Sequence, residues 1–109
     1  MEIQQKDGVT VISTDERLDA LAAPKLKDAV KKMSEKSSAK LVIDLAKTKL
    51  IDSSGCGALV ASLRTLLKNQ GDLKIARPSP QAQTLFQLTR LHRVFEIYDN
   101  LDTAIESFQ

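Results

Sequence analysis

The stretch LVIDLAKTKLIDSSGCGALVASLRTLL, residues 41–67, contains the two patterns that decide the fold. Its first five residues, Leu41–Leu45, are almost continuously apolar, which is typical of a central strand that is covered on both faces. From Cys56 to Leu67, apolar residues recur at helical spacing and form a single stripe. The stretch therefore predicts a buried strand, a polar connection and an amphipathic helix, and Gly71 is expected to cap that helix.

The flanking segments predict the remaining strands and helices. The Asp-Gly pair at residues 7–8 is a strong signal for a hairpin between segments 3–5 and 9–13. Pro24 and Pro80 stand where the first turn of a helix accepts proline, and Asn100 can cap a last helix. Further strands are predicted at residues 73–76 and 95–98. On the helix after Pro80, the residues expected to face inward are Leu85, Phe86 and Thr89.

After the hairpin, strands and helices alternate along the chain. This order predicts an α/β fold, with a small, mixed but mostly parallel β-sheet, an N-terminal hairpin and about four helices packed on the sheet. The chain has no internal repeat and no linker-like segment, so residues 1–109 are expected to form a single domain.

The composition argues against several classes of function. The formal net charge is only +2 and aromatic residues make up 4% of the chain, so a nucleic-acid-binding surface is not expected. No apolar run approaches the roughly 20 residues that a membrane-spanning helix needs. A single cysteine cannot form an internal disulfide, and no secretory signal is visible. We therefore expect a cytoplasmic protein that does not insert into a membrane.

The usual catalytic patterns are also missing from the sequence. His92 is the only histidine and is expected to be an exposed loop residue, whereas Cys56 belongs to the apolar stripe and is expected to fill the core. Neither residue has the neighbours of a metal site. Phosphate-binding, dinucleotide-binding and nucleophile-elbow motifs are absent. The prediction is a protein that is not an enzyme and uses no metal or other cofactor.

The polar helix start at residues 52–57 can be interpreted in two ways. Asp52 or Ser53 can cap the helix, with Ser54 in its first turn, but capping alone does not explain Gly55 and Gly57, since glycine weakens a helix. The glycines indicate close approach by a neighbouring strand or by a partner protein. A serine here could also accept a phosphate, which a helix N-terminus tolerates and which would disrupt docking to the bare surface.

The stretches VIDL (42–45) and IDSSGCGAL (51–59) resemble the core signature of STAS domains, in particular that of bacterial anti-sigma factor antagonists. LDA (18–20) followed by APKL (23–26) is similar to the segment that precedes the first helix in that family. The resemblance covers nearly the whole chain. It implies a small, mostly parallel sheet with one helical face.

The resemblance also implies a regulatory role. In that family the unphosphorylated protein binds an anti-sigma factor that is also a serine kinase of the histidine-kinase-like ATPase type, which frees a sigma factor for transcription. The kinase modifies the serine before the first glycine of the motif, which corresponds to Ser54, and a metal-dependent serine phosphatase reverses the reaction. By the same correspondence, the partner-binding residues are Asp19, Asp52, Ser53, Gly55 and Gly57. The alternative is a constitutive STAS subunit of a lipid or solute transport complex.

Overall fold

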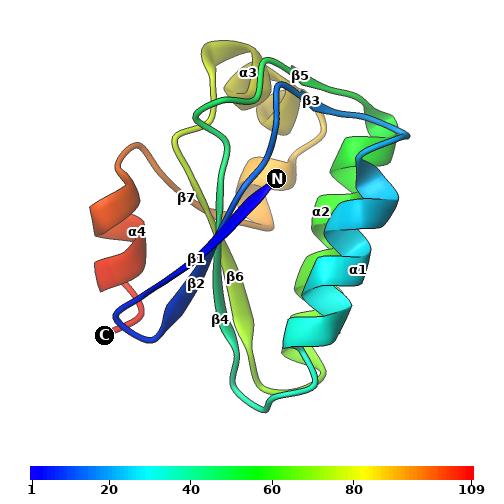
Figure 1. Cartoon of the computed structure of the whole chain (residues 1–109). Coiled ribbons are helices and arrows are strands. Elements are labelled where there is room, and N and C mark those ends of the chain that lie inside the picture. Colours follow the sequence, from blue (N-terminus) through cyan, green and yellow to red (C-terminus); the bar gives the residue numbers. More distant parts are fainter.

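The computed structural model describes residues 1–109, which fold around a five-stranded sheet (Figure 1). The strand order is β1 (Glu2–Lys6), β2 (Val9–Ser13), β4 (Lys40–Asp44), β6 (Asp72–Ala76) and β7 (Glu96–Tyr98). β1 pairs antiparallel with β2, and all other neighbours are parallel. The predicted hairpin and the mostly parallel sheet are therefore confirmed.

Four α-helices and one short 3-10 helix connect or follow the strands. The α-helices are α1 (Ala23–Met33), α2 (Ser53–Leu67), α3 (Pro80–Leu88) and α4 (Leu101–Glu106), and the 3-10 helix is η1 (Leu91–Arg93). As predicted, proline lies in the first turn of α1 and of α3, and the Asn100 side chain caps α4. None of the helices combines the length and the apolar character needed to cross a membrane.

The sheet is covered on both faces. Leu41 and Ile43 of β4 belong to a core of 17 buried residues that also includes residues of α1, α2 and α3. Val42, which points to the opposite face, packs in a second core of six buried residues under α4. Figure 1 shows α4 and the α1–α2 pair on opposite sides of the sheet. The expectation of one helical face is therefore wrong, because the apolar face of α4 covers the other side.

Two short strands were not predicted from the sequence. β3 (Arg17–Leu18) and β5 (Leu50–Ile51) pair in parallel and form a separate two-stranded sheet. A strand of two residues contains no alternation that a sequence pattern could reveal. The pair matters here because it joins the segment before α1 to the segment before α2.

Two expectations about single residues are also wrong. Gly71 does not adopt the left-handed conformation at the end of α2, because Gln70 does so, with φ 59°. A Cβ on Gly71 would lie 2.6 Å from the carbonyl oxygen of Ala39, so close packing against that backbone requires the glycine. Thr89, expected to face inward, is exposed, and its hydroxyl donates to the carbonyl of Leu85 at 2.8 Å.

Candidate functional site

The residues singled out from the sequence lie at the edge of the sheet where the parallel strands end. β3, β5 and the first turns of α1 and α2 lie together there (Figure 1). The carbonyl of Leu18 in β3 accepts a hydrogen bond from the backbone N–H of Asp52 at 3.3 Å. In open α/β sheets this edge is the usual place for binding sites. The segments around Asp19 and Ser54, far apart in sequence, thus contribute to one surface.

Asp52 is the residue that caps α2. It has an extended backbone, and its Oδ1 accepts the N–H of Gly55 at 2.9 Å. The first backbone hydrogen bond of the helix runs from the N–H of Cys56 to the carbonyl of Asp52, also at 2.9 Å. The sequence allowed either Asp52 or Ser53 to cap the helix. In the structure Asp52 is the cap, and the Ser53 hydroxyl does not take part in capping.

Ser53 and Ser54 are exposed in the first turn of α2. Neither hydroxyl makes a hydrogen bond within the chain, and the backbone N–H groups of both residues also lack an acceptor there. Unpaired N–H groups at a helix start carry partial positive charge and attract anions. Both serines are therefore accessible to another molecule, and the backbone around them tolerates an added negative charge.

The two glycines of the motif have different surroundings. A Cβ on Gly55 would lie 2.1 Å from the carbonyl oxygen of Leu18, closer than any real side-chain contact. Gly55 is buried, and its lack of a side chain lets β3 pack against the helix start. Gly57 is exposed, and a Cβ there would meet nothing within 4 Å. The neighbouring strand explains Gly55 but not Gly57.

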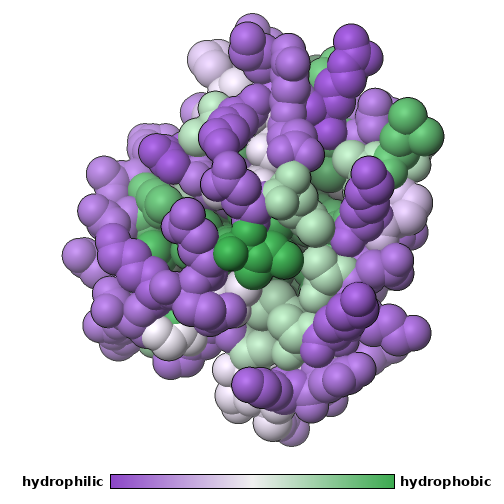
Figure 2. Space-filling view, in the orientation of Figure 1, coloured by the Kyte–Doolittle hydropathy of each residue, from purple (hydrophilic) through white to green (hydrophobic).

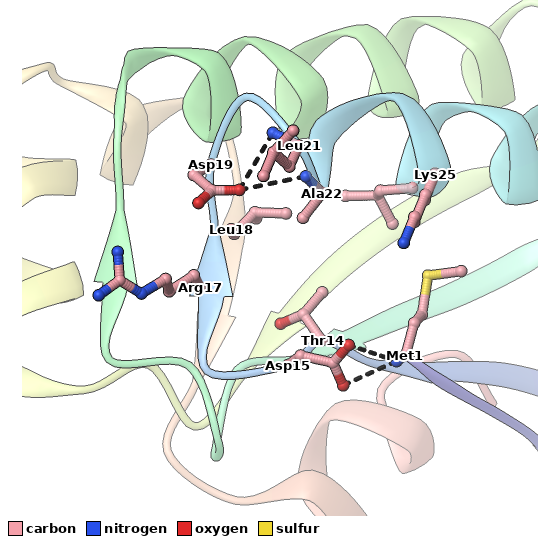
Figure 3. Close-up of a pocket in the computed structure, with 10 residues that line it drawn as sticks. Met1, Thr14, Asp15, Arg17, Leu18, Asp19, Leu21, Ala22 and Lys25 are labelled. Atoms are coloured by element: carbon pink, nitrogen blue, oxygen red, sulfur yellow. Dashed lines mark hydrogen bonds and ion pairs between the residues drawn. The ribbon is translucent and has the colours of Figure 1, made fainter.

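Asp19 shapes the turn that leads into α1. Its Oδ1 accepts the backbone N–H groups of Leu21 and Ala22, each at 3.1 Å (Figure 3). The turn borders a small cavity of about 130 Å³, which is also lined by Lys25 and Leu26 of α1. Because one oxygen of the Asp19 carboxylate receives both N–H groups, this side chain holds the loop beside Leu18 in place.

Two exposed leucines lie on the segments that form this surface, and neither was predicted from the sequence. The exposed fraction is 84% for Leu21, in the loop after β3, and 46% for Leu50, in β5. Leu50 lies opposite Arg17 in the β3–β5 pair. The only signal in the sequence is that each leucine falls outside a helical or strand pattern. Both side chains are therefore available for apolar contact with another molecule.

A charged pair fixes the same edge of the main sheet. Arg77 donates from Nε to Oδ1 of Asp44 at 3.0 Å and from Nη2 to Oδ2 at 2.5 Å. The Asp44 carboxylate is buried at the end of β4, and its hydrogen bond raises the pKa of the Arg77 guanidinium above its ordinary value. This two-point contact joins the ends of β4 and β6. No sequence pattern indicates it, because the partners are 33 residues apart.

The remaining candidates for chemistry lie apart from one another. Cys56 is buried, as predicted, and burial, followed by the nearby Asp52 carboxylate, raises the pKa of its thiol. His92 is exposed in η1, as predicted, and its Nδ1 lies 3.2 Å from the carbonyl oxygen of Phe86. No three His, Cys, Asp or Glu side chains are grouped so that they could hold a metal ion. The helix start is therefore the best candidate site.

Comparison with known proteins gives consistent matches over the chain. The family model of the STAS domain matches residues 1–104. An anti-sigma-B factor antagonist of Listeria monocytogenes is 32% identical over 98 residues, which cover 89% of this chain and 86% of the relative.

Solved structures match over a similar extent. An anti-sigma factor antagonist from Mycobacterium paratuberculosis is 30% identical, with a TM-score of 0.85 over 97% of this chain and 90% of that one. The Bacillus protein SpoIIAA in its phosphorylated form shares the fold at 19% identity, with a TM-score of 0.77 over 99% and 98% of the two chains. The family match over residues 1–104 and the relative at 32% identity show that the chain belongs to the STAS domain family.

Proposed function

We propose that this protein is an anti-sigma factor antagonist, a partner-switching module in which phosphorylation of Ser54 controls binding. Unphosphorylated, it binds an anti-sigma factor that is also a serine kinase of the histidine-kinase-like ATPase type, and so it regulates transcription. It is the substrate of that kinase and not itself an enzyme. The observation that carries the proposal is the exposed, unbonded serine pair on a helix start. The 32% identity to an anti-sigma-B factor antagonist supports the same role.

Several features favour Ser54 as the phosphate acceptor. Its hydroxyl is exposed, and the unpaired N–H groups of the first turn can donate to a phosphate. The phosphate would add nearly two negative charges close to the Asp52 carboxylate. A partner that docks on the unmodified surface would then meet new bulk and charge, and binding would weaken.

The docking surface would combine the helix start with the loop before α1. Ser53 and Gly57 lie four residues apart on α2 and so share one face, while Asp19 holds the adjacent loop. Asp52 and Gly55 support this surface through the cap and through the close packing of β3. Leu21 and Leu50 would supply its apolar contacts.

The alternative, a constitutive subunit of a lipid or solute transport complex, is less well supported. A sulfate transporter family protein from Wolinella succinogenes shares the fold, with a TM-score of 0.80, but at 15% identity. The relative with 32% identity is an anti-sigma-B factor antagonist. We therefore favour the switch.

Phosphate mapping tests the acceptor. The protein is incubated with ATP and a kinase of the histidine-kinase-like ATPase type encoded in the same genome, and the modified residue is located by mass spectrometry. We expect one phosphate on Ser54, lost in Ser54→Ala and retained in Ser53→Ala. Phosphate on another residue, with Ser54 unmodified, would refute the assignment.

Affinity measurements test the switch itself. Ser54→Asp should bind the kinase at least roughly tenfold more weakly than the wild type, because a charge is introduced in the docking surface. The melting temperature should hardly change. A metal-dependent serine phosphatase should restore binding to the phosphorylated protein. If Ser54→Asp binds the kinase as tightly as the unphosphorylated wild type does, charge at this position is not the switch.

A further inference from the structure

A long groove runs between α1 and the edge strand β1, on the side of the sheet that carries the main core. Two adjoining cavities of about 660 and 620 Å³ form it, and both are lined by Lys32 and Met33. The apolar part is formed by Met33 with Ile3 of β1 and Ala29 of α1, and 53% of Ile3 is exposed. Figure 2 shows a strip of hydrophobic residues between hydrophilic ones on this face of the molecule.

The border of this groove is strongly cationic. Lys25 and Lys32 of α1 line it, and Lys36 and Lys40 line its far end. None of these four lysines takes part in an ion pair within the chain, and Asp28 is the only carboxylate among the lining residues. The other charged residues of the chain, 12 basic and 13 acidic, nearly cancel. The positive charge is thus concentrated along the groove.

The helix dipole does not explain why these four lysines lie together along the groove. Lysines in the last turn of a helix are favoured by the helix dipole, which explains Lys31 and Lys32. Lys25 lies in the first turn of α1, where the dipole disfavours a cation, and Lys36 and Lys40 lie beyond the helix. The four lysines thus occupy different positions relative to α1, and what they have in common is that they line the groove.

The backbone of β1 is also available for pairing. Asp7 and Gly8 have φ angles of 55° and 79° and form a two-residue turn, so the flanking pair Lys6–Val9 is hydrogen-bonded. Hydrogen-bonded and non-hydrogen-bonded pairs alternate along an antiparallel ladder. The N–H and C=O groups of Ile3 and Gln5 therefore point away from β2, and they have no backbone partner in the chain. This edge can accept another strand.

The geometry points to a second docking site in which an extended, acidic segment of a partner protein pairs with β1. Its main chain would bond to the free groups of Ile3 and Gln5, as in other complexes where a peptide extends a sheet. Apolar side chains on the segment would lie over Ala29 and Met33, and carboxylates would meet the lysines. Neither Asp19 nor any residue of α2 lines this groove, so the inference does not depend on the proposed switch.

A peptide titration tests this site directly. The probe is a blocked eight-residue peptide, Val-Thr-Glu-Thr-Val-Thr-Glu-Thr, in which valine and glutamate alternate along one face of the extended strand, and it is added to the ¹⁵N-labelled full chain. We expect saturable shifts of the amide signals of Ile3, Gln5 and Ala29, which weaken as salt is added because charge pairs contribute. The same peptide with lysine in place of both glutamates, and the same peptide N-methylated at every second residue, should bind at least roughly tenfold more weakly.

Matched charge variants separate the groove from net charge. Lys32→Glu combined with Lys36→Glu should weaken peptide binding roughly tenfold or more, because two of the lysines that meet the peptide are reversed. Lys27→Glu combined with Lys31→Glu changes the net charge equally on exposed positions of α1 that do not line the groove, so it should bind within roughly twofold of the wild type.

Four results would overturn the inference. If the N-methylated peptide binds as tightly as the unmethylated one, strand pairing is excluded. If both double variants lose the same amount of peptide affinity, the net charge of the protein explains the effect and the groove does not. Shifts confined to the surface around Ser54 would assign the peptide to the other site. Shifts of Ile3 and Gln5 that depend on protein concentration without peptide would identify a second copy of the chain as the occupant.

Discussion

At the scale of single residues, two glycines two positions apart have opposite physical roles. Gly55 is buried against the carbonyl of Leu18, whereas Gly57 is exposed with open space where a side chain would be. The first glycine serves the fold of this chain. The second has no internal reason to be glycine, which supports its proposed place in the docking surface.

Gly55→Ala should destabilise the protein by about 2–3 kcal/mol, because the new methyl group would overlap the backbone of β3 and force it away. Urea unfolding followed by circular dichroism measures this difference in the free energy of unfolding. A change below about 0.5 kcal/mol, the usual size for a surface substitution, would mean that β3 is not held against the helix start.

Gly57→Ala is the matched control, and its effect on stability should have the opposite sign. Alanine is favoured over glycine in a helix by about 0.5–1 kcal/mol, and no atom lies in its way. The same variant should bind the kinase more weakly than the wild type does. Unchanged affinity, measured by calorimetry, would remove Gly57 from the docking surface.

Cys56 should react slowly with thiol reagents. Burial and the nearby Asp52 carboxylate raise its pKa, so the reactive thiolate is scarcer at pH 8 than for an ordinary cysteine. Alkylation by iodoacetamide at that pH should be slower than for free cysteine and should accelerate on unfolding in urea. Alkylation as fast as that of the free amino acid would contradict both the burial and the direction of the pKa shift.

At the scale of elements, the site depends on two strands that sequence patterns could not reveal. The long apolar run of Leu41–Leu45 and the stripe from Cys56 to Leu67 were enough to predict β4 and α2, because a buried surface repeats over many residues. β3 and β5 contain two residues each, and only their pairing brings Asp19 near the start of α2. The motif at the start of α2 could be located from the sequence, but its proximity to the loop that contains Asp19 could not be predicted.

The position of α4 shows a second limit of the same kind. Leu101, Ala104 and Ile105 recur at helical spacing, but periodicity identifies the apolar face of a helix and not the face of the sheet that it covers. The structure places this face over Val9, Val11 and Val42, opposite the main core. A helix of six residues thus supplies the second layer of the molecule.

Ile105→Ala should therefore release α4 in preference to the other helices. Ile105 is 1% exposed in the smaller core, and shortening a buried isoleucine to alanine costs about 2–5 kcal/mol. Hydrogen exchange should accelerate for the amides of α4 more than for those of α2. The exposed Thr103→Ala, as control, should leave exchange nearly unchanged. Equal acceleration in both helices would show that α4 does not open separately.

At the scale of the whole molecule, charge is nearly balanced, and one phosphate is a large change. The formal net charge is +2 at pH 7, and a phosphoserine carries about −1.5 to −2. The modified protein is therefore close to neutral. Proteins without net charge associate and precipitate more readily.

Phosphorylation of Ser54 should lower the isoelectric point visibly and reduce solubility near pH 7, while the circular dichroism spectrum stays the same. Isoelectric focusing and light scattering of the two forms measure these effects. Phosphorylated Ser53→Ala should behave like the phosphorylated wild type. A changed spectrum would mean that the phosphate alters the fold, contrary to its exposed position at the helix start.

The contact between Leu18 and the start of α2 also limits how such a protein can evolve. One carbonyl group receives the N–H of Asp52 and occupies the space that a side chain at Gly55 would need. A substitution in either segment must be compensated in the other, although more than 30 residues separate them in the chain. Among homologues, the loop before α1 and the start of α2 should therefore covary, and chimaeras that exchange only one of them should fold poorly.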